Sequence, residues 1–180
     1  ALINADQVSE ARDLLKDNTW NQYGADAFFL CAVCDIKVAN FFGAIASLTQ
    51  ALRMDGNSRR ALVEMSYCYR NIFDEDKALE FANKANSIEN GDYGQLLKLA
   101  HTYATFDQNQ TAEKLYKKCL KINPRDPSAL LVLAKDFPSE EATSYLEIAN
   151  ELLTSTSLSP REQSQLYFTR AYIYEHANNI

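Results

Sequence analysis

Cys31 and Cys34 have the spacing most suggestive of chemistry in this chain of 180 residues. In a helix, two thiols three residues apart lie one turn apart and can share a metal ion or form a redox pair. A structural zinc site needs four ligands, however, and neither His101 nor His176 stands at a matching spacing. We therefore interpret the two cysteines as packing residues of a helical core and expect no metal and no cofactor. A metal or small-molecule site at these two thiols remains the alternative.

The sequence contains no pattern typical of a catalytic site. A nucleophilic Ser or Cys needs a nearby histidine and an orienting acid, and the two histidines stand in stretches with helical periodicity. No glycine-rich phosphate loop, His-Glu-x-x-His motif or dinucleotide fingerprint occurs. The acidic runs at residues 74–76 and 140–141 begin expected helices, where carboxylates interact favourably with the helix dipole. We predict that the chain is not an enzyme.

Charge and hydropathy exclude two classes of partner. The net charge is −6, whereas phosphate binding needs clustered Lys and Arg, so no nucleic acid is expected. The longest purely apolar run, residues 27–34, is too short to span a bilayer.

The four cysteines match no secreted disulfide framework, which favours the reducing cytoplasm or nucleus. Because the chain opens on Ala1 in mid-pattern, we expect a fragment or a processed form.

A 34-residue recurrence organises the chain. Ala44, Ala78 and Ala112 each begin a triplet spaced i, i+4, i+7, which places three residues on one helical face. Another small residue stands twelve positions before each triplet. The triplets are Ala44, Leu48 and Ala51, then Ala78, Ala82 and Ala85, then Ala112, Tyr116 and Cys119, preceded by Ala32, Ser66 and Ala100. The pattern predicts two helices in each repeating unit, packed closely through small side chains.

This recurrence resembles the tetratricopeptide repeat family. The clearest stretch is residues 96–127, where residues 123–127 resemble the turn between repeats, with Asp126 able to cap the next helix and Pro127 in its first turn. The resemblance implies an all-α fold, a right-handed superhelical solenoid of antiparallel helix pairs. The sequence departs from the family pattern in lacking the turn glycine and in placing Asp35 where an aromatic residue is expected.

The register predicts a single array over residues 1–180. Its parts are a preceding helix and linker at 1–24, full repeats at 25–58, 59–92 and 93–126, a shortened repeat at 127–158, and the first helix of a further repeat at 159–180. The fourth repeat is four residues short, because Pro138 disfavours helix at Phe137 and ends the first helix early. Ser159 and Glu162 form a capping-box pattern around Pro160.

The resemblance implies a concave groove lined by the first helix of each repeat. The nine residues predicted to bind a partner there are Phe29, Val33, Lys37, Arg60, Tyr67, Arg70, Lys98, His101 and Lys135. Further residues on the same wall are Ile36, Val63, Glu64, Asn71, Leu97, Thr105 and Leu131. The middle of this groove is basic, which favours an extended or helical peptide segment with acidic and apolar side chains. The alternative interpretation is that these charges are solvated surface groups.

The predicted function is that of a protein–protein interaction scaffold or adaptor, a subunit of a larger assembly. The alternative is an accessory array of a larger enzyme whose catalytic part lies outside this chain. Self-association through the end repeats is a further candidate. Family members that bind chaperone tails hold a carboxylate with Lys and Asn, but the matching positions include Phe29, Val33 and Glu64, so that role is not expected.

Overall fold

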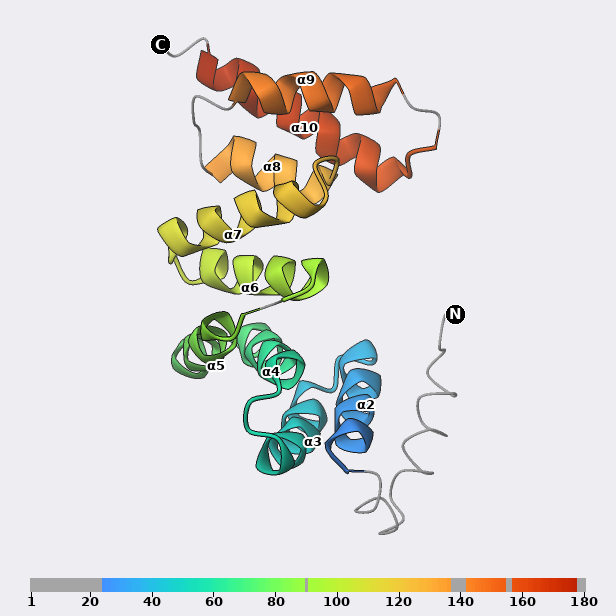
Figure 1. Cartoon of the computed structure of the whole chain (residues 1–180). Helices are drawn as coiled ribbons and strands as arrows, with labels where there is room; N and C mark the ends of the chain where they lie inside the picture. The colour runs from blue at the N-terminus through green and yellow to red at the C-terminus, as the bar shows by residue number, and fades with distance from the viewer. Residues whose placement is uncertain (1–23, 90, 137–141, 155–156, 178–180) are drawn as a thin grey trace. The chain divides into compact units, whose positions relative to one another are not determined.

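The structure is a computed structural model that describes residues 24–89, 91–136, 142–154 and 157–177. All regular elements within these ranges are α-helices (Figure 1). The helix expected before residue 24 lies outside the described residues, as does the early helix end expected at Phe137 and Pro138. The all-α class predicted from the sequence is confirmed.

The chain forms two compact units, Ala1–Asp107 and Gln108–Ile180. The described helices of the first unit are α2 (Gly24–Lys37), α3 (Phe41–Met54), α4 (Arg59–Asn71), α5 (Glu75–Ser87) and α6 (Tyr93–Thr105). Those of the second are α7 (Asn109–Ile122), α8 (Pro127–Asp136), α9 (Ala142–Leu153) and α10 (Pro160–Ala177). The limit between the units falls between α6 and α7, inside the stretch 93–126 assigned to one repeat.

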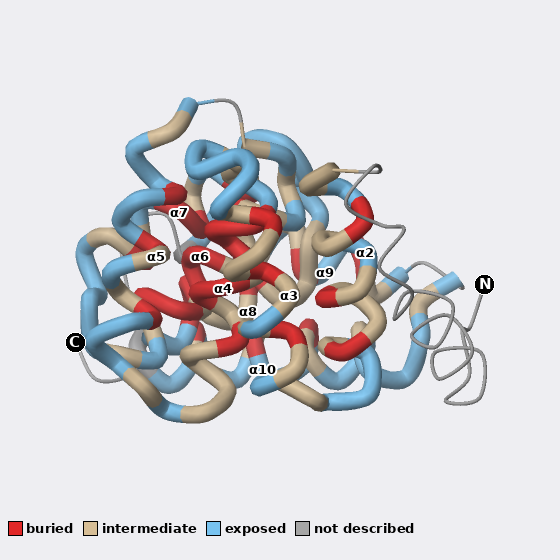
Figure 2. The backbone as a smooth tube through the Cα atoms, turned by 90° about the horizontal axis from the view of Figure 1, so that it is seen from below, coloured by how far each residue is buried: buried red, intermediate tan, exposed pale blue. Residues whose placement is uncertain are grey.

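Within the first unit, α4 packs against each of the other four described helices. Small residues make these contacts close, since a helix face without large side chains lets two backbones approach each other. The alanines of the recurrence that have no exposed surface in this unit are Ala32, Ala44, Ala78, Ala82, Ala85 and Ala100. Buried and exposed stretches alternate along the helices, as expected for amphipathic elements (Figure 2).

The turns inside the helix pairs share one backbone geometry. Ala39, Phe73 and Asp107 stand at equivalent positions of successive repeats, and each has a left-handed φ, at 56°, 57° and 55°. The following N–H bonds back to the helix that ends: the N–H of Asn40 to Asp35 O at 2.9 Å and that of Asp74 to Tyr69 O at 3.0 Å. This pattern closes the C-terminus of a helix without a glycine.

The next residue in each of the first two turns caps the second helix. The side chain of Asn40 accepts a hydrogen bond from the N–H of Gly43 at 3.2 Å, and that of Asp74 accepts one from the N–H of Lys77 at 3.2 Å. Each cap satisfies an N–H group that has no partner within its own helix. The acidic run at residues 74–76 therefore begins α5, as the sequence predicts.

Asp35 occupies the position that holds Tyr69 and Tyr103 in the next two repeats. Tyr69 stacks on Phe81 with ring centroids 5.6 Å apart, whereas Asp35 is buried and accepts a hydrogen bond from Nδ2 of Asn40 at 2.9 Å. A polar contact between the end of α2 and the start of α3 thus replaces an aromatic one. An acid is therefore tolerated at a position where the family pattern has an aromatic residue, because the buried carboxylate has a hydrogen-bond partner.

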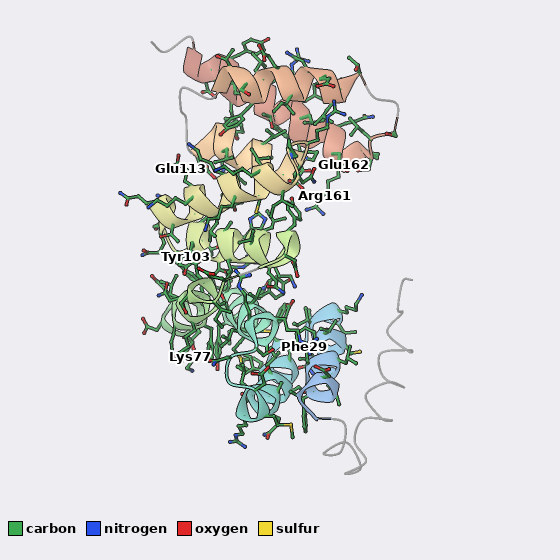
Figure 3. The ribbon with its side chains drawn as sticks, viewed as in Figure 1. Phe29, Lys77, Tyr103, Glu113, Arg161 and Glu162 are labelled. Carbon is green, nitrogen blue, oxygen red and sulfur yellow. The ribbon has the colours of Figure 1, made fainter. Side chains whose placement is uncertain are left out.

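Arg59 and Tyr103 link the second pair of helices to α6. The guanidinium of Arg59 donates to Ala85 O and to Oε1 of Gln95, both at 3.0 Å. The first of these bonds satisfies a carbonyl group in the last turn of α5. The hydroxyl of Tyr103 donates to Oδ1 of Asn83 at 2.7 Å (Figure 3).

In the second unit, α10 packs against both α8 and α9, while α8 also contacts α7 and α9. Oδ1 of Asp126 caps α8 by accepting from the N–H of Ala129 at 2.6 Å. Ser159 and Glu162 cap α10 reciprocally, with Ser159 N–H to Glu162 Oε2 at 2.8 Å and Glu162 N–H to Ser159 Oγ at 3.3 Å (Figure 3). Both caps were predicted from the sequence and are confirmed.

Candidate partner-binding groove

The first helices of the pairs in the first unit, α2, α4 and α6, carry eight of the nine predicted groove residues. Phe29, Val33 and Lys37 lie on α2, Arg60, Tyr67 and Arg70 on α4, and Lys98 and His101 on α6. Because α2 and α6 both contact α4, these side chains belong to neighbouring elements. The ninth residue, Lys135, lies in the second unit, where its ammonium is 3.6 Å from a carboxylate oxygen of Asp136.

Tyr67 lies at the centre of this set. Two cations lie over its ring, with the guanidinium carbon of Arg70 at 4.9 Å and Nζ of Lys98 at 5.2 Å from the centroid. Phe41 meets the same ring edge-on at a centroid distance of 6.2 Å. The ring of Tyr67 is half-buried, so it forms an aromatic platform with positive charge beside it.

Lys98 and Glu64 form an ion pair that joins α6 to α4. The side chain of Glu64 is only 13% exposed, whereas that of Lys98 is 38% exposed. The second carboxylate oxygen of Glu64 is buried and has no hydrogen-bond partner among the described residues. Much of the charge of Lys98 is thus balanced inside the protein.

The positive charge of Arg60 is also balanced, by an acid that is not among the predicted groove residues. Its guanidinium forms an ion pair with Asp26 of α2 and lies 4.6 Å from the centroid of the Phe29 ring (Figure 3). The excess of positive charge on this wall is therefore smaller than the sequence suggests. The contact itself joins α4 to α2 through an aromatic ring and an ion pair.

An open pocket of about 460 Å³ lies between the C-terminal ends of α4 and α6. The residues that line it are Arg70, Asn71, Phe73, His101 and Thr105. The sequence placed four of these on one wall, and the structure brings them together around the pocket. Phe73 was missed, although the 34-residue recurrence could have marked it as a bulky residue at a turn position.

The cysteines differ in environment. Cys31 and Cys34 are half-buried on α2, while Cys68 and Cys119 are fully buried. Burial raises the pKa of Cys68 to about 12 and that of Cys119 to about 11, which makes both thiols poor nucleophiles. Within the described ranges, no group of three or more His, Cys, Asp or Glu side chains could hold a metal ion.

The phenylalanines of α2 and α3 differ in how far they are exposed. Phe28, Phe29 and Phe41 are half-buried, whereas Phe42 is 74% exposed.

Across the part of the chain that the structure describes, no helix has the length and apolar character needed to cross a membrane.

Comparison with known proteins places this architecture among helical repeat proteins. Residues 94–136 match the tetratricopeptide repeat family. The crystal structure of YrrB, a tetratricopeptide repeat protein with an unusual peptide-binding site, is similar with a TM-score of 0.68 and 15% identity, over 98% of this chain and 86% of that one. A structure of the MamA protein has a TM-score of 0.66 at 17% identity, over 85% of this chain and 86% of that one.

A tetratricopeptide repeat protein from Parabacteroides merdae ATCC 43184 is similar with a TM-score of 0.62 at 19% identity, covering 97% of this chain and 66% of that one. No curated protein matches the chain in sequence. The described residues therefore have the tetratricopeptide repeat fold, and residues 94–136 carry the sequence pattern of that family. The resemblance predicted from the sequence is confirmed.

Proposed function

We propose that the protein is a non-catalytic interaction scaffold of the cytoplasm or nucleus that binds a peptide segment of a partner along α2, α4 and α6. The fold is that of tetratricopeptide repeat proteins, for which protein interaction is the general role. The observation that carries the proposal is the half-buried ring of Tyr67, with Arg70 and Lys98 over it, close to an open pocket that Arg70 also lines.

The chemistry of these side chains favours a segment that carries both carboxylates and apolar groups. An aromatic ring provides apolar contact area, and a guanidinium can bind a carboxylate in a bidentate manner. YrrB is described as having a peptide-binding site, which is consistent with peptide binding on this fold. We extend that property to this chain as a proposal that rests on the side chains of its own first unit.

The test begins with a random library of 12-residue peptides displayed on phage and selected on the wild-type protein. We expect enrichment of peptides that contain both acidic and large apolar residues. Fluorescein-labelled copies of the enriched peptides are then titrated by anisotropy against wild type and against Tyr67→Leu. This variant keeps apolar packing beside Phe41 but removes the aromatic platform, and we expect about tenfold weaker binding.

A pair of charge reversals provides the matched control. Lys37 and Arg53 are both exposed, but Lys37 lies on α2 and Arg53 on α3, the second helix of its pair. We expect Lys37→Glu to weaken binding several-fold and Arg53→Glu to leave it unchanged. Enrichment of basic peptides, or equal binding to wild type and Tyr67→Leu, would overturn the proposal.

Self-association is a second candidate function, and it rests on α10. Tyr167, Phe168 and Tyr174 of this helix are 58%, 57% and 48% exposed. Tyr167 and Tyr174 share one helical face with the exposed Ala171, and such an exposed apolar patch is typical of an interface. We expect light scattering to report a dimer for the wild type and a monomer for Tyr167→Glu/Phe168→Glu, with Arg161→Glu on the same helix as a control. A monomeric wild type at high concentration would exclude this function.

A further inference from the structure

Phe73 combines two features that are unfavourable for stability. Its φ of 57° lies in the left-handed region, which bulky residues rarely adopt, and the residue is 80% exposed. The equivalent positions in the repeats before and after it hold Ala39 and Asp107, with nearly the same φ. The turn therefore requires no aromatic residue, and the fold does not explain the ring of Phe73.

The ring stands at a pocket whose other lining residues are polar. Arg70, Asn71, His101 and Thr105 line it together with Phe73, and we call the set of five the turn-edge pocket. Arg70 provides a permanent positive charge, and none of the five residues carries a carboxylate. The acid next to Phe73 in sequence, Asp74, forms an ion pair with Lys77, in which its Oδ2 lies 3.1 Å from Nζ. The pocket is thus suited to an anionic group.

The hydrogen bonds of the pocket residues indicate what else it can bind. Nδ2 of Asn71 donates to Tyr67 O at 2.8 Å, and Oγ1 of Thr105 donates to His101 O at 2.7 Å. One N–H of the Asn71 amide and the hydroxyl proton of Thr105 are thus used within their own helices, and the oxygens of both side chains can accept a peptide N–H. A phosphate group is less well matched, because phosphate sites in proteins normally gather several cations. A single guanidinium beside such acceptors suits the carboxylate of a peptide.

We propose that the turn-edge pocket binds an acidic residue and a neighbouring large apolar residue of the peptide that occupies the groove. The carboxylate binds Arg70, and the apolar side chain packs on the ring of Phe73. This inference rests on the proposed function and identifies its anchoring site. It also gives the bulky residue at this left-handed position a role, since an exposed ring contributes free energy only when a partner covers it.

The experiment compares two identical backbone changes. Phe73→Gly and Ala39→Gly each place glycine at a left-handed turn position, but only the first removes a side chain from the pocket. The probes are fluorescein-labelled peptides enriched on wild type from the random 12-residue phage library. We expect these peptides to contain an acidic residue beside a large apolar one. Phe73→Gly should weaken their binding at least about tenfold, whereas Ala39→Gly should leave it unchanged.

A double-mutant cycle then tests the carboxylate contact. Replacing the acidic residue of the peptide with its amide should weaken binding to wild type about tenfold but have little further effect on Arg70→Gln. Equal binding by wild type and Phe73→Gly, combined with lost binding by Tyr67→Leu, would overturn the anchoring site and leave the proposed function standing. If no peptide is enriched on wild type, the proposed function fails, and the anchoring site fails with it.

Discussion

Phe73 and Ala39 occupy the same place in consecutive helix pairs, with φ of 57° and 56° at the turn between the two helices. One side chain is a methyl group, and the other is an aromatic ring on a residue that is 80% exposed. Because the two turns agree in geometry despite this difference, hydrogen bonding at the helix end, rather than residue type, determines the turn conformation. The side chain at this position can therefore vary with function.

Replacing Phe73 with glycine should stabilise the protein. Glycine adopts a left-handed φ without the steric cost borne by other residues, so we expect the free energy of unfolding to rise by about 1 kcal/mol. Ala39→Gly should give a similar gain. Urea denaturation followed by circular dichroism measures both, as a higher midpoint with an unchanged slope. A lower midpoint in both variants would show that the left-handed φ is not strained.

The 34-residue recurrence was sufficient to predict the helices and their buried faces. Ala44, Ala78 and Ala112 have no exposed surface, because small residues at i, i+4 and i+7 must face a neighbouring helix. The caps at Asp126 and Ser159 were also predictable, since they depend only on local sequence. These features require no knowledge of how distant side chains are oriented.

The candidate site was less predictable because it depends on contacts between helices. The ion pair of Asp26 with Arg60 joins residues of successive repeats, and the charge count from the sequence omitted that acid. The role of Phe73 depends on a backbone conformation that its residue type argues against. The absent turn glycine was visible in the sequence, but the residue that adopts the left-handed φ in its place was not.

Reversing the charge of Lys98 should destabilise the protein, a consequence not expected from the sequence alone. Lys98→Glu would place a second carboxylate beside Glu64, whose side chain is only 13% exposed. We expect a loss of about 1–2 kcal/mol in the free energy of unfolding. The swapped variant Glu64→Lys/Lys98→Glu should recover most of this loss. If the swapped variant is no more stable than Lys98→Glu, the pair does not interact as described.

Gly43 is expected to tolerate no side chain, unlike Gly56. A Cβ on Gly43 would lie 2.2 Å from Nδ2 of Asn40 and 3.0 Å from a carboxylate oxygen of Asp35. Gly43→Ala would therefore displace the cap of α3 and the partner of a buried carboxylate, at a cost of about 1–2 kcal/mol.

The matched control is Gly56→Ala, where the nearest atom to a Cβ would be Leu52 O at an ordinary 3.6 Å. We expect its urea midpoint to be close to that of wild type. Equal midpoints for Gly43→Ala and Gly56→Ala would contradict the close packing of Asp35, Asn40 and Gly43.

The buried thiols should make the protein sensitive to alkaline pH. Burial raises the pKa of Cys68 from 9.0 to about 12 and that of Cys119 from 9.0 to about 11. Above pH 9 the unfolded chain releases these protons while the folded protein retains them, so the free energy of unfolding falls as pH rises. The stabilising contribution is complete below pH 9 and is lost progressively between pH 9 and about pH 11–12.

Urea midpoints measured at pH 8, 9, 10 and 11 test this dependence. The variant Cys68→Ala/Cys119→Ala removes both groups, and it should have a lower midpoint at pH 8 because it leaves small cavities. Its midpoint should then decline less steeply from pH 9 to pH 11 than that of wild type, since the ionisation of the unfolded thiols no longer contributes. Parallel curves for the two proteins would mean that the alkaline loss arises from other groups, such as Tyr103, whose pKa burial raises to about 12.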